Sequence, residues 1–326
     1  MGKLGENALS KCAFIRSISL SDGITEIGKY AFDHCQNLET VVIPETVTKI
    51  GPDAFAWSGL KSIILPYQPY QPYQSKGLTE IGKFAFYHCS NLETVVIPET
   101  VTKIGAFAFA GSGLKSIILP DGRLTEIEED TFIGCNNLES VVIPETVTKI
   151  GPDAFACSGL KSIILPHGLT EIGKESFYRC CNLENVIIPD SVTKIGRYAF
   201  ACSRLKSIIL PDGLTEIEEG AFNGCRNLET VVIPETVTKI GPKAFACSGL
   251  KSIILPDGRL SEIGNNAFCR CSNLENVIIP NSITKIGPHA FAESGLKSIT
   301  LLDGRLTEIG KDAFRDCHNL VMKYRN

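Results

Sequence analysis

Apolar and polar positions recur along this chain at an interval too long for a helix and too regular for an ordinary globular core. Two kinds of unit alternate: an acidic unit such as "LTEIGKFAFYHCSNLETVVIPET", from Leu78, and a basic unit such as "VTKIGPDAFACSGLKSIILP", from Val147. The step from acidic to basic unit is 23 residues, and the return step is 22 or 23 except for 31 between Val47 and Leu78. This period predicts a single array of about fourteen units with no second domain.

Each unit contains the pattern L-x-x-V-x-I, as at Leu38, Val41 and Ile43. Its period of two predicts a short strand with Val41 and Ile43 inward, and stacked units then form a parallel sheet. Pro44 and its equivalents end the strand, because proline cannot donate to a ladder. The segment "VTKIG" predicts a second extended stretch on the opposite side, where we expect the glycine to turn the chain. The "AF" pair places a phenylalanine in thirteen units, beginning at Phe32, which predicts a continuous core.

The repeated string A-F-x-x-C-x-x-L-x-x-V-x-I-P-x-x-V-x-x-I-G resembles the BspA-like, or Treponema pallidum-type, leucine-rich repeat over residues 8–320. More familiar leucine-rich repeats have Asn or Cys where these acidic units have Thr46 or Ser191. The resemblance implies a right-handed solenoid with a parallel β-sheet on the concave face and short extended or helical turns on the convex face. It also implies a non-enzymatic scaffold for a protein partner, in adhesion or host interaction at a cell surface, and no catalytic residues.

Three segments depart from the period. Residues 1–23 form a degenerate N-terminal unit in which residues 4–23 fit an acidic unit, and residues 306–326 fit a C-terminal capping unit. We expect the last strand to turn Lys323 and Arg325 inward, because inward charges keep an edge strand from pairing with another chain. The third segment is an inserted loop at residues 67–76, whose Tyr-Gln-Pro spacing predicts an extended conformation.

Charge alternates from unit to unit at two positions, with Glu39 followed by Lys61 and Glu26 followed by Lys49. Neighbouring strands lie about 4.8 Å apart, so each charge is expected between two of opposite sign. The rows are either a recognition surface or a control of register, because a slip of one unit would place like charges side by side. An exposed pair contributes only about 0.2–1 kcal/mol, which favours the second interpretation.

The outward position of the first strand is aliphatic in almost every unit, with small polar residues beside it. Monomers rarely expose a continuous apolar patch of more than a few hundred Å², so this row is the predicted partner-binding site. In the alternative interpretation, β-branched residues only stabilise the sheet. The tyrosines of the inserted loop flank the same face, as a binding element or as a tolerated triplet duplication. The candidate residues are Val96, Ile118, Val142, Ile164, Ile187, Ile209, Val232 and Ile254, with Ser140, Ser162, Asn185, Tyr67, Tyr70 and Tyr73.

Most of the thirteen cysteines fall three residues before the strand leucine, a slot that holds Trp57, Gly111 or Glu293 in other units. A slot that accepts such replacements is not a ligand set, so we expect free packing thiols and no metal. Disulfides between neighbouring units stay open, because their Cα atoms come near bonding range.

Composition narrows the function further. The chain is 44% hydrophobic with a net charge of −4, which offers no support for nucleic-acid binding. No apolar run reaches the roughly 18 residues of a membrane span, and the first residues lack the apolar segment of a signal peptide. Catalytic motifs such as H-E-x-x-H and G-x-S-x-G are absent, so we expect no enzyme and no cofactor. The compartment stays open, since the resemblance suggests a cell-surface or secreted protein while no signal peptide is present. A monomer or weak dimer is expected, and the alternative function is a structural array that self-associates through the same face.

Overall fold

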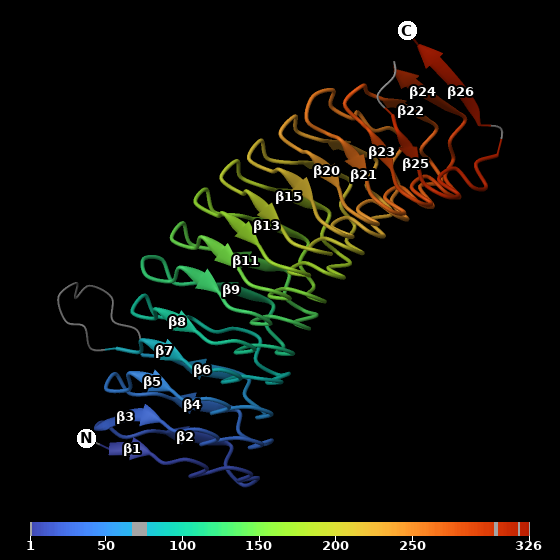
Figure 1. The fold of residues 1–326 in the computed structure, drawn as a ribbon. Helices are drawn as coiled ribbons and strands as arrows, with labels where there is room; N and C mark the ends of the chain where they lie inside the picture. The colour runs from blue at the N-terminus through green and yellow to red at the C-terminus, as the bar shows by residue number, and fades with distance from the viewer. Residues whose placement is uncertain (1, 67–76, 303–305, 319, 326) are drawn as a thin grey trace. The chain divides into compact units, whose positions relative to one another are not determined.

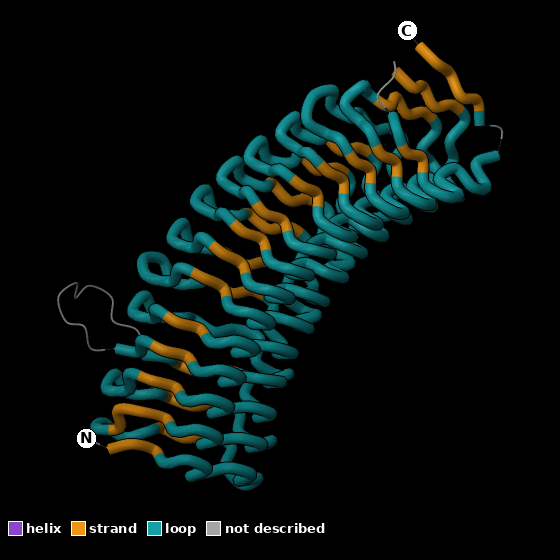
Figure 2. The backbone as a smooth tube through the Cα atoms, viewed as in Figure 1, coloured by secondary structure: helices purple, strands orange, loops and turns teal. Residues whose placement is uncertain are grey.

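The computed structural model describes residues 2–66, 77–302, 306–318 and 320–325 (Figure 1). Tyr67, Tyr70 and Tyr73 of the inserted loop therefore lie outside the described residues. The chain divides into two compact units, Met1–Pro166 and His167–Asn326. In each unit, every repeat forms one coil of a β-solenoid that carries two short strands or bridges, and the described residues contain no helix (Figure 2).

The first strand ladder, here called the long-strand sheet, is parallel and in register, as where Val41 lies opposite Ile63. It forms where the L-x-x-V-x-I pattern predicts. Isolated bridges such as Val96 with Ile118 continue it through coils without a named strand. Its strands in the first unit are β2 (Ser17–Ser19), β4 (Thr40–Val42), β6 (Ser62–Ile64), β9 (Ser116–Ile118), β11 (Ser140–Val142) and β13 (Ser162–Ile164). Those in the second unit are β15 (Asn185–Ile187), β17 (Ser207–Ile209), β19 (Thr230–Val232), β22 (Asn276–Ile279), β24 (Ser298–Leu302) and β26 (Val321–Arg325).

The second ladder, here called the short-strand sheet, forms from the "TEI" and "TKI" segments. Glu26 pairs with Lys49 and Lys49 with Glu80, so opposite charges alternate along it as expected. Its strands in the first unit are β1 (Gly2–Leu4), β3 (Ile24–Ile27), β5 (Lys49–Ile50), β7 (Glu80–Ile81), β8 (Lys103–Ile104), β10 (Glu126–Ile127) and β12 (Lys149–Ile150). Those in the second unit are β14 (Glu171–Ile172), β16 (Lys194–Ile195), β18 (Glu216–Ile217), β20 (Lys239–Ile240), β21 (Glu262–Ile263), β23 (Lys285–Ile286) and β25 (Glu308–Ile309).

A column of phenylalanine rings fills the core of each unit, as the "AF" pair predicts. In the first unit Phe86, Phe109 and Phe132 are fully buried, with successive ring centroids 5.2 and 5.6 Å apart and the planes nearly parallel. Such offset stacking adds to the apolar area that each ring buries. Since a ring such as Phe109 contacts the rings of the coils before and after it, no single repeat completes this core alone.

The segment between the two sheets, here called the turn segment, alternates hydrogen bonds within a coil and between coils. Phe55 N–H donates to the carbonyl of Ala85 in the next coil, whereas Ala56 N–H donates to Asp53 within its own coil. Asp53 and Trp57 have φ values of 53° and 58°, and the equivalent residues in other coils are also left-handed. The turn segment therefore consists of tight turns among the described residues.

The glycine after most short strands serves close backbone approach, which corrects the expectation that it turns the chain. A Cβ on Gly51 would lie 2.8 Å from the carbonyl oxygen of Ile27 and 2.9 Å from the carbonyl carbon of Gly28. Gly28 and Gly82 stand in equivalent contacts, and none of the three has a left-handed φ. Because glycine lacks a Cβ, neighbouring coils can come this close at these three positions.

Residues 2–23 form a basic coil, so the expectation of a degenerate acidic unit was wrong. Lys3 lies opposite Glu26 in the register of β1 with β3, and its Nζ is 2.8 Å from Glu26 Oε1. Arg16 precedes β2 just as Lys61 precedes β6. The first coil thus obeys the same charge alternation as its neighbours, although its apolar residues have diverged.

The last strand is also displaced from the register counted in the sequence. Met322 lies opposite Ile299 and Tyr324 opposite Leu301, whereas Lys323 lies opposite the outward Thr300. The expectation that Lys323 faces inward was therefore wrong. A slip of one residue exchanges the two faces of a strand, and this register places apolar residues beside the core while the lysine remains at the exposed face.

Candidate functional site

The exposed face of the long-strand sheet carries a row of aliphatic side chains. Within one strand pair, Ile117 and Val141 are buried while their neighbours Ile118 and Val142 are 67% and 56% exposed. Ile118 lies directly opposite Val142 in the register of β9 with β11. Because strand side chains alternate between faces, the same local sequence that fills the core also builds this outer row.

We call this set the aliphatic row. Its eleven members have exposed fractions between 41% and 80%. The row includes all eight aliphatic residues that the sequence predicted, and Ser140, Ser162 and Asn185 are exposed beside it. Their part in binding stays a prediction. The members are Val42, Ile64, Val96, Ile118, Val142 and Ile164 in the first unit, and Ile187, Ile209, Val232, Ile254 and Ile278 in the second.

In the second unit a hollow of about 700 Å³ lies on this face. Ile187 and Ile209 form part of its apolar lining, and the loop at His167 and Ser191 forms part of its rim. The Ser191 hydroxyl lies 2.6 Å from the His167 carbonyl oxygen and 2.7 Å from that of Leu169, so its single proton is shared between them and fixes this loop. The hollow combines apolar walls with a few polar groups, the composition typical of a pocket for an apolar side chain.

Ion pairs border the aliphatic row. Lys115 Nζ lies 2.7 Å from Glu93 Oε2, and Lys251 Nζ lies 2.8 Å from Glu229 Oε2; in both, the lysine pairs with the preceding coil. In these pairs more than half of each side chain's surface is exposed, so each contributes little to stability. Because each pair joins one positive and one negative side chain, the pairs give the aliphatic row a polar border with little net charge.

The cysteines occupy two different places in the turn segment, which corrects the single slot expected from the sequence. Cys135 lies three residues after the core phenylalanine, where its Sγ donates to the Phe109 carbonyl at 3.1 Å and lies 3.3 Å from Ser112 Oγ. Burial raises the pKa of the Cys135 thiol to about 11. Cys157 lies two residues after its phenylalanine, half-buried, in the slot of Trp57. Cys89, Cys225 and Cys271 are free, buried thiols in the same place as Cys135.

The corrected alignment reveals an aromatic stack that the sequence interpretation missed. Trp57 takes the same place in its coil as His34 and His88, and the three rings stack on one another. Counting residues from the core phenylalanine, rather than from the strand leucine, would have aligned them. Basic units are one residue shorter between these two landmarks, as a comparison of Phe55–Leu60 with Phe32–Leu38 shows.

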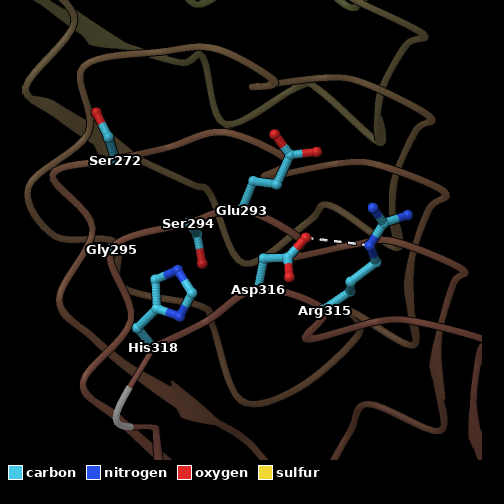
Figure 3. Close-up of a pocket in the computed structure, with 7 residues that line it drawn as sticks. All are labelled: Ser272, Glu293, Ser294, Gly295, Arg315, Asp316 and His318. Carbon is cyan, nitrogen blue, oxygen red and sulfur yellow. Dashed lines mark hydrogen bonds and ion pairs between the residues drawn. The ribbon is translucent and has the colours of Figure 1, made fainter.

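A second hollow, of about 510 Å³, lies at the turn segments of the second unit (Figure 3). Its charged groups are paired: Arg315 Nε donates to Asp316 Oδ2 at 3.1 Å, and Arg270 Nε donates to Glu293 Oε2 at 2.9 Å. Because these partners already satisfy one another, the hollow offers little to a ligand. Among the described residues, no group of His, Cys, Asp or Glu converges in a way that could hold a metal ion. The same part of the chain has no helix that could span a membrane.

Two stacked parallel ladders, one coil per repeat and a phenylalanine column together define a β-solenoid of the leucine-rich-repeat class. The profile of the BspA type leucine rich repeat region matches residues 2–73, 79–203 and 193–321, in six copies. The chain belongs to this family. Leucine-rich-repeat proteins generally act as protein-interaction scaffolds, and nothing in the family match or the similar structures points to an enzyme.

Several solved structures are similar to this chain. A leucine-rich repeat protein from Bacteroides ovatus is 28% identical with a TM-score of 0.62, over 94% of this chain and 73% of that one. A leucine rich cell surface protein from Faecalibacterium prausnitzii is 27% identical with a TM-score of 0.60, over 95% and 88%. A leucine-rich repeat protein from Eubacterium ventriosum is 26% identical with a TM-score of 0.55, over 86% and 83%. A search of curated proteins finds no match.

Proposed function

We propose that this protein is a non-enzymatic scaffold that binds a protein partner on the aliphatic row, in adhesion or host interaction at a cell surface. The observation that carries the proposal is the exposure of eleven aliphatic side chains at equivalent positions of successive coils. Scattered exposed aliphatic residues need no explanation, but contiguous apolar patches on soluble proteins usually mark interaction sites. The similar protein from F. prausnitzii is described as a cell surface protein, which supports the proposed setting.

The composition of this face suits a protein partner. Covering one half-exposed isoleucine contributes about 1 kcal/mol, so a partner that spans several coils gains several kcal/mol before the cost of association. Ser140, Ser162 and Asn185 supply hydrogen-bonding groups beside the row, and the ion pairs form a polar rim. The hollow between Ile187 and Ile209 would receive an apolar side chain of the partner as an anchor.

Self-association through the same face is the second candidate. An aliphatic row on one copy would cover the row on another, and the partner would then be a second copy of this chain. Light scattering separates the two candidates, because self-association predicts that the fraction of dimer increases with protein concentration. Binding to a different protein predicts a monomer at all concentrations.

The experiment compares two triple variants, each of which adds three lysines. The first changes the aliphatic row of the first unit by Val96→Lys, Ile118→Lys and Val142→Lys. The matched control changes exposed threonines of the short-strand side by Thr102→Lys, Thr125→Lys and Thr148→Lys. Circular dichroism checks that both variants fold. Candidate partners are captured from extracts on immobilised wild-type protein, purified, and titrated against all three proteins.

The proposal expects the purified partner to bind the wild type and the control equally and the row variant at least tenfold more weakly. Equal binding to both variants would show that the aliphatic row only stabilises the sheet. A concentration-dependent dimer of the wild type that the row variant cannot form would establish self-association in place of the first candidate.

A further inference from the structure

The first and last coils of the array are of opposite type, and their short strands lie at sheet edges. The first coil, residues 2–23, is basic through Lys3 of β1, and the last, residues 306–318 and 320–325, is acidic through Glu308 of β25. Within the chain, Lys285 of the preceding basic coil lies opposite Glu308. If the first coil of a second copy stacked on the last coil, Lys3 would lie opposite Glu308 and the alternation would continue.

Both coils also leave part of the apolar core uncovered. Ile309 of the last coil is 48% exposed, whereas the equivalent Ile286 of the coil before it is fully buried. In the first coil, Leu9 takes the place of the core phenylalanine, and its side chain is half-buried, as is that of Phe314 in the last coil. Stacking the two coils would continue the core column and cover these side chains.

The turn segments of the two coils have complementary unpaired backbone groups. Between neighbouring coils, amides such as Phe32 N–H donate to carbonyls such as that of Ala54 at 2.7 Å. Among the described residues, the three equivalent amides of the last coil have no such partner, and the three equivalent carbonyls of the first coil accept no amide. In the stacked arrangement the donors Asp312, Phe314 and Asp316 would lie opposite the acceptors Glu6, Ala8 and Ser10.

Opposite charges would meet at two places in these turn segments. Three residues before the core position, the first coil carries Glu6 and the last coil carries Lys311. Neighbouring coils of the chain do pair charges at this place, since the Arg197 guanidinium lies 3.7 Å from the Glu219 carboxylate. A contact between Glu6 and Lys311 would therefore repeat an arrangement that the fold already contains.

The second place lies two residues after the core position, where the first coil carries Lys11 and the last carries Asp316. Arg270 and Glu293 occupy this place in neighbouring coils and pair at 2.9 Å. Asp316 also contacts Arg315 at 3.1 Å on the surface of the last coil (Figure 3). The other charged residues would face neutral ones: Asp312 opposite Asn7, Arg315 opposite Ser10, Leu320 opposite Arg16, Lys323 opposite Ser19 and Arg325 opposite Ser21.

Gly5 of the first coil is an independent sign of a coil in front of it. The equivalent Gly28 is held to glycine by the preceding coil, because a Cβ there would lie 2.5 Å from the Leu4 carbonyl oxygen. A Cβ on Gly5 would meet nothing within 4 Å, and Gly5 has no left-handed φ. The single chain therefore does not need glycine here, whereas stacking on the Ile309 carbonyl of another copy does.

We propose that the first coil of one copy stacks on the last coil of another, so that the protein associates head to tail. Such a contact joins two different surfaces and leaves one of each free, so the association continues beyond the dimer. It extends both ladders from copy to copy and leaves the aliphatic row uncovered. The function proposed above and this association can therefore fail independently of each other.

Sedimentation velocity of the full chain over a range of concentrations tests the association. We expect the weight-average mass to rise with concentration past that of a dimer. The apparent association constant should fall several-fold between low salt and about 0.15 M salt, because the pairs at the contact are exposed to solvent. Pairing through the aliphatic row would instead stop at a dimer.

Two charge-swap variants locate the contact without changing the net charge. The first-coil swap is Glu6→Lys with Lys11→Glu, and the last-coil swap is Lys311→Glu with Asp316→Lys. Each swap sets like charges against the wild-type coil, so each variant alone should associate at least tenfold more weakly. In a mixture, the two swapped coils are again complementary, and association should return to about the wild-type strength. Circular dichroism checks that both variants fold.

A third variant tests the close approach at Gly5. Gly5→Ala should weaken association at least tenfold while the urea midpoint of the protein does not fall. The matched control is Gly258→Ala, since a Cβ on Gly258 also meets nothing within 4 Å and its coil lies away from both ends. The control should associate as the wild type does.

Three outcomes would overturn the proposal. The first is a wild type that stays monomeric up to its solubility limit. The second is association of the swap variants or of Gly5→Ala at wild-type strength, which would place the contact elsewhere. The third is a mixture of the two swaps that associates no more strongly than either swap alone.

Discussion

Truncating one ring of the phenylalanine column should destabilise the first unit strongly. Phe109 is fully buried and stacks on Phe86 and Phe132 at 5.2 and 5.6 Å. Removal of a buried phenylalanine ring costs about 3–5 kcal/mol through lost burial and the cavity that remains. Stacked neighbours on both sides add to this loss, so Phe109→Ala should cost about 4–5 kcal/mol of unfolding free energy.

The chain supplies its own control. Phe14 is 98% exposed, so Phe14→Ala should change the unfolding free energy by less than about 0.5 kcal/mol. Urea unfolding followed by circular dichroism measures both variants, and hydrogen exchange shows where the structure opens. Exchange should accelerate first at amides that join neighbouring coils, such as Phe109 N–H to Thr131. A loss below about 1 kcal/mol for Phe109→Ala, or equal losses for the two variants, would refute the idea that each ring is essential to a continuous core.

Three further predictions concern charge, thiols and hydroxyls. Burial, together with the nearby Asp153 charge, raises the pKa of Asp130 to about 6. The contribution of this carboxyl to the free energy of unfolding is therefore fully present below pH 4 and is lost as pH rises through 6. Asp130→Asn should therefore stabilise the protein by about 1 kcal/mol at pH 7, allowing for its partial exposure, and by nothing at pH 3.5; an equal effect at both values would contradict this. Burial raises the pKa of the Cys89 and Cys225 thiols to about 12, so a thiol-reactive dye at pH 8 should label exposed Cys181 rapidly and these two only after unfolding. The Thr146 hydroxyl donates to the Leu124 carbonyl at 2.7 Å, so Thr146→Val should cost about 1 kcal/mol in thermal unfolding, whereas a neutral result would show that the carbonyl finds another donor.

The strands and the aliphatic row could be predicted from the sequence because a period of two admits only one assignment of faces. Once Val41 and Ile43 are inward, Val42 must be outward, and the structure places all three accordingly. The fold class followed with equal certainty, since a fixed period of 22 or 23 residues is the signature of a solenoid.

The turn segments could not be predicted in the same way. Their left-handed positions accept Trp57, Gly111, Cys157 and Glu293, so side-chain type gives no pattern to follow. Alignment from the strand leucine then merged two different slots, which hid both the buried thiols and the stack of His34, Trp57 and His88. The first coil was assigned wrongly because its apolar residues no longer follow the repeat. Lys3 nevertheless keeps the charge alternation, since it lies opposite Glu26.

The uniform core does not determine which repeat each coil stacks on. Every coil offers its neighbours nearly the same phenylalanine, leucine and isoleucine contacts, so a coil displaced by one repeat would bury the same apolar surface. The alternating charges differ between adjacent coils, and a one-coil slip would turn pairs such as Lys115 with Glu93 into like-charge contacts. Each exposed pair contributes at most about 1 kcal/mol, but a slip changes the sign of every pair on both ladders at once. The sum over many weak pairs can therefore select one register where the uniform core selects none, and the strict alternation, kept even by Lys3 in the divergent first coil, fits that purpose.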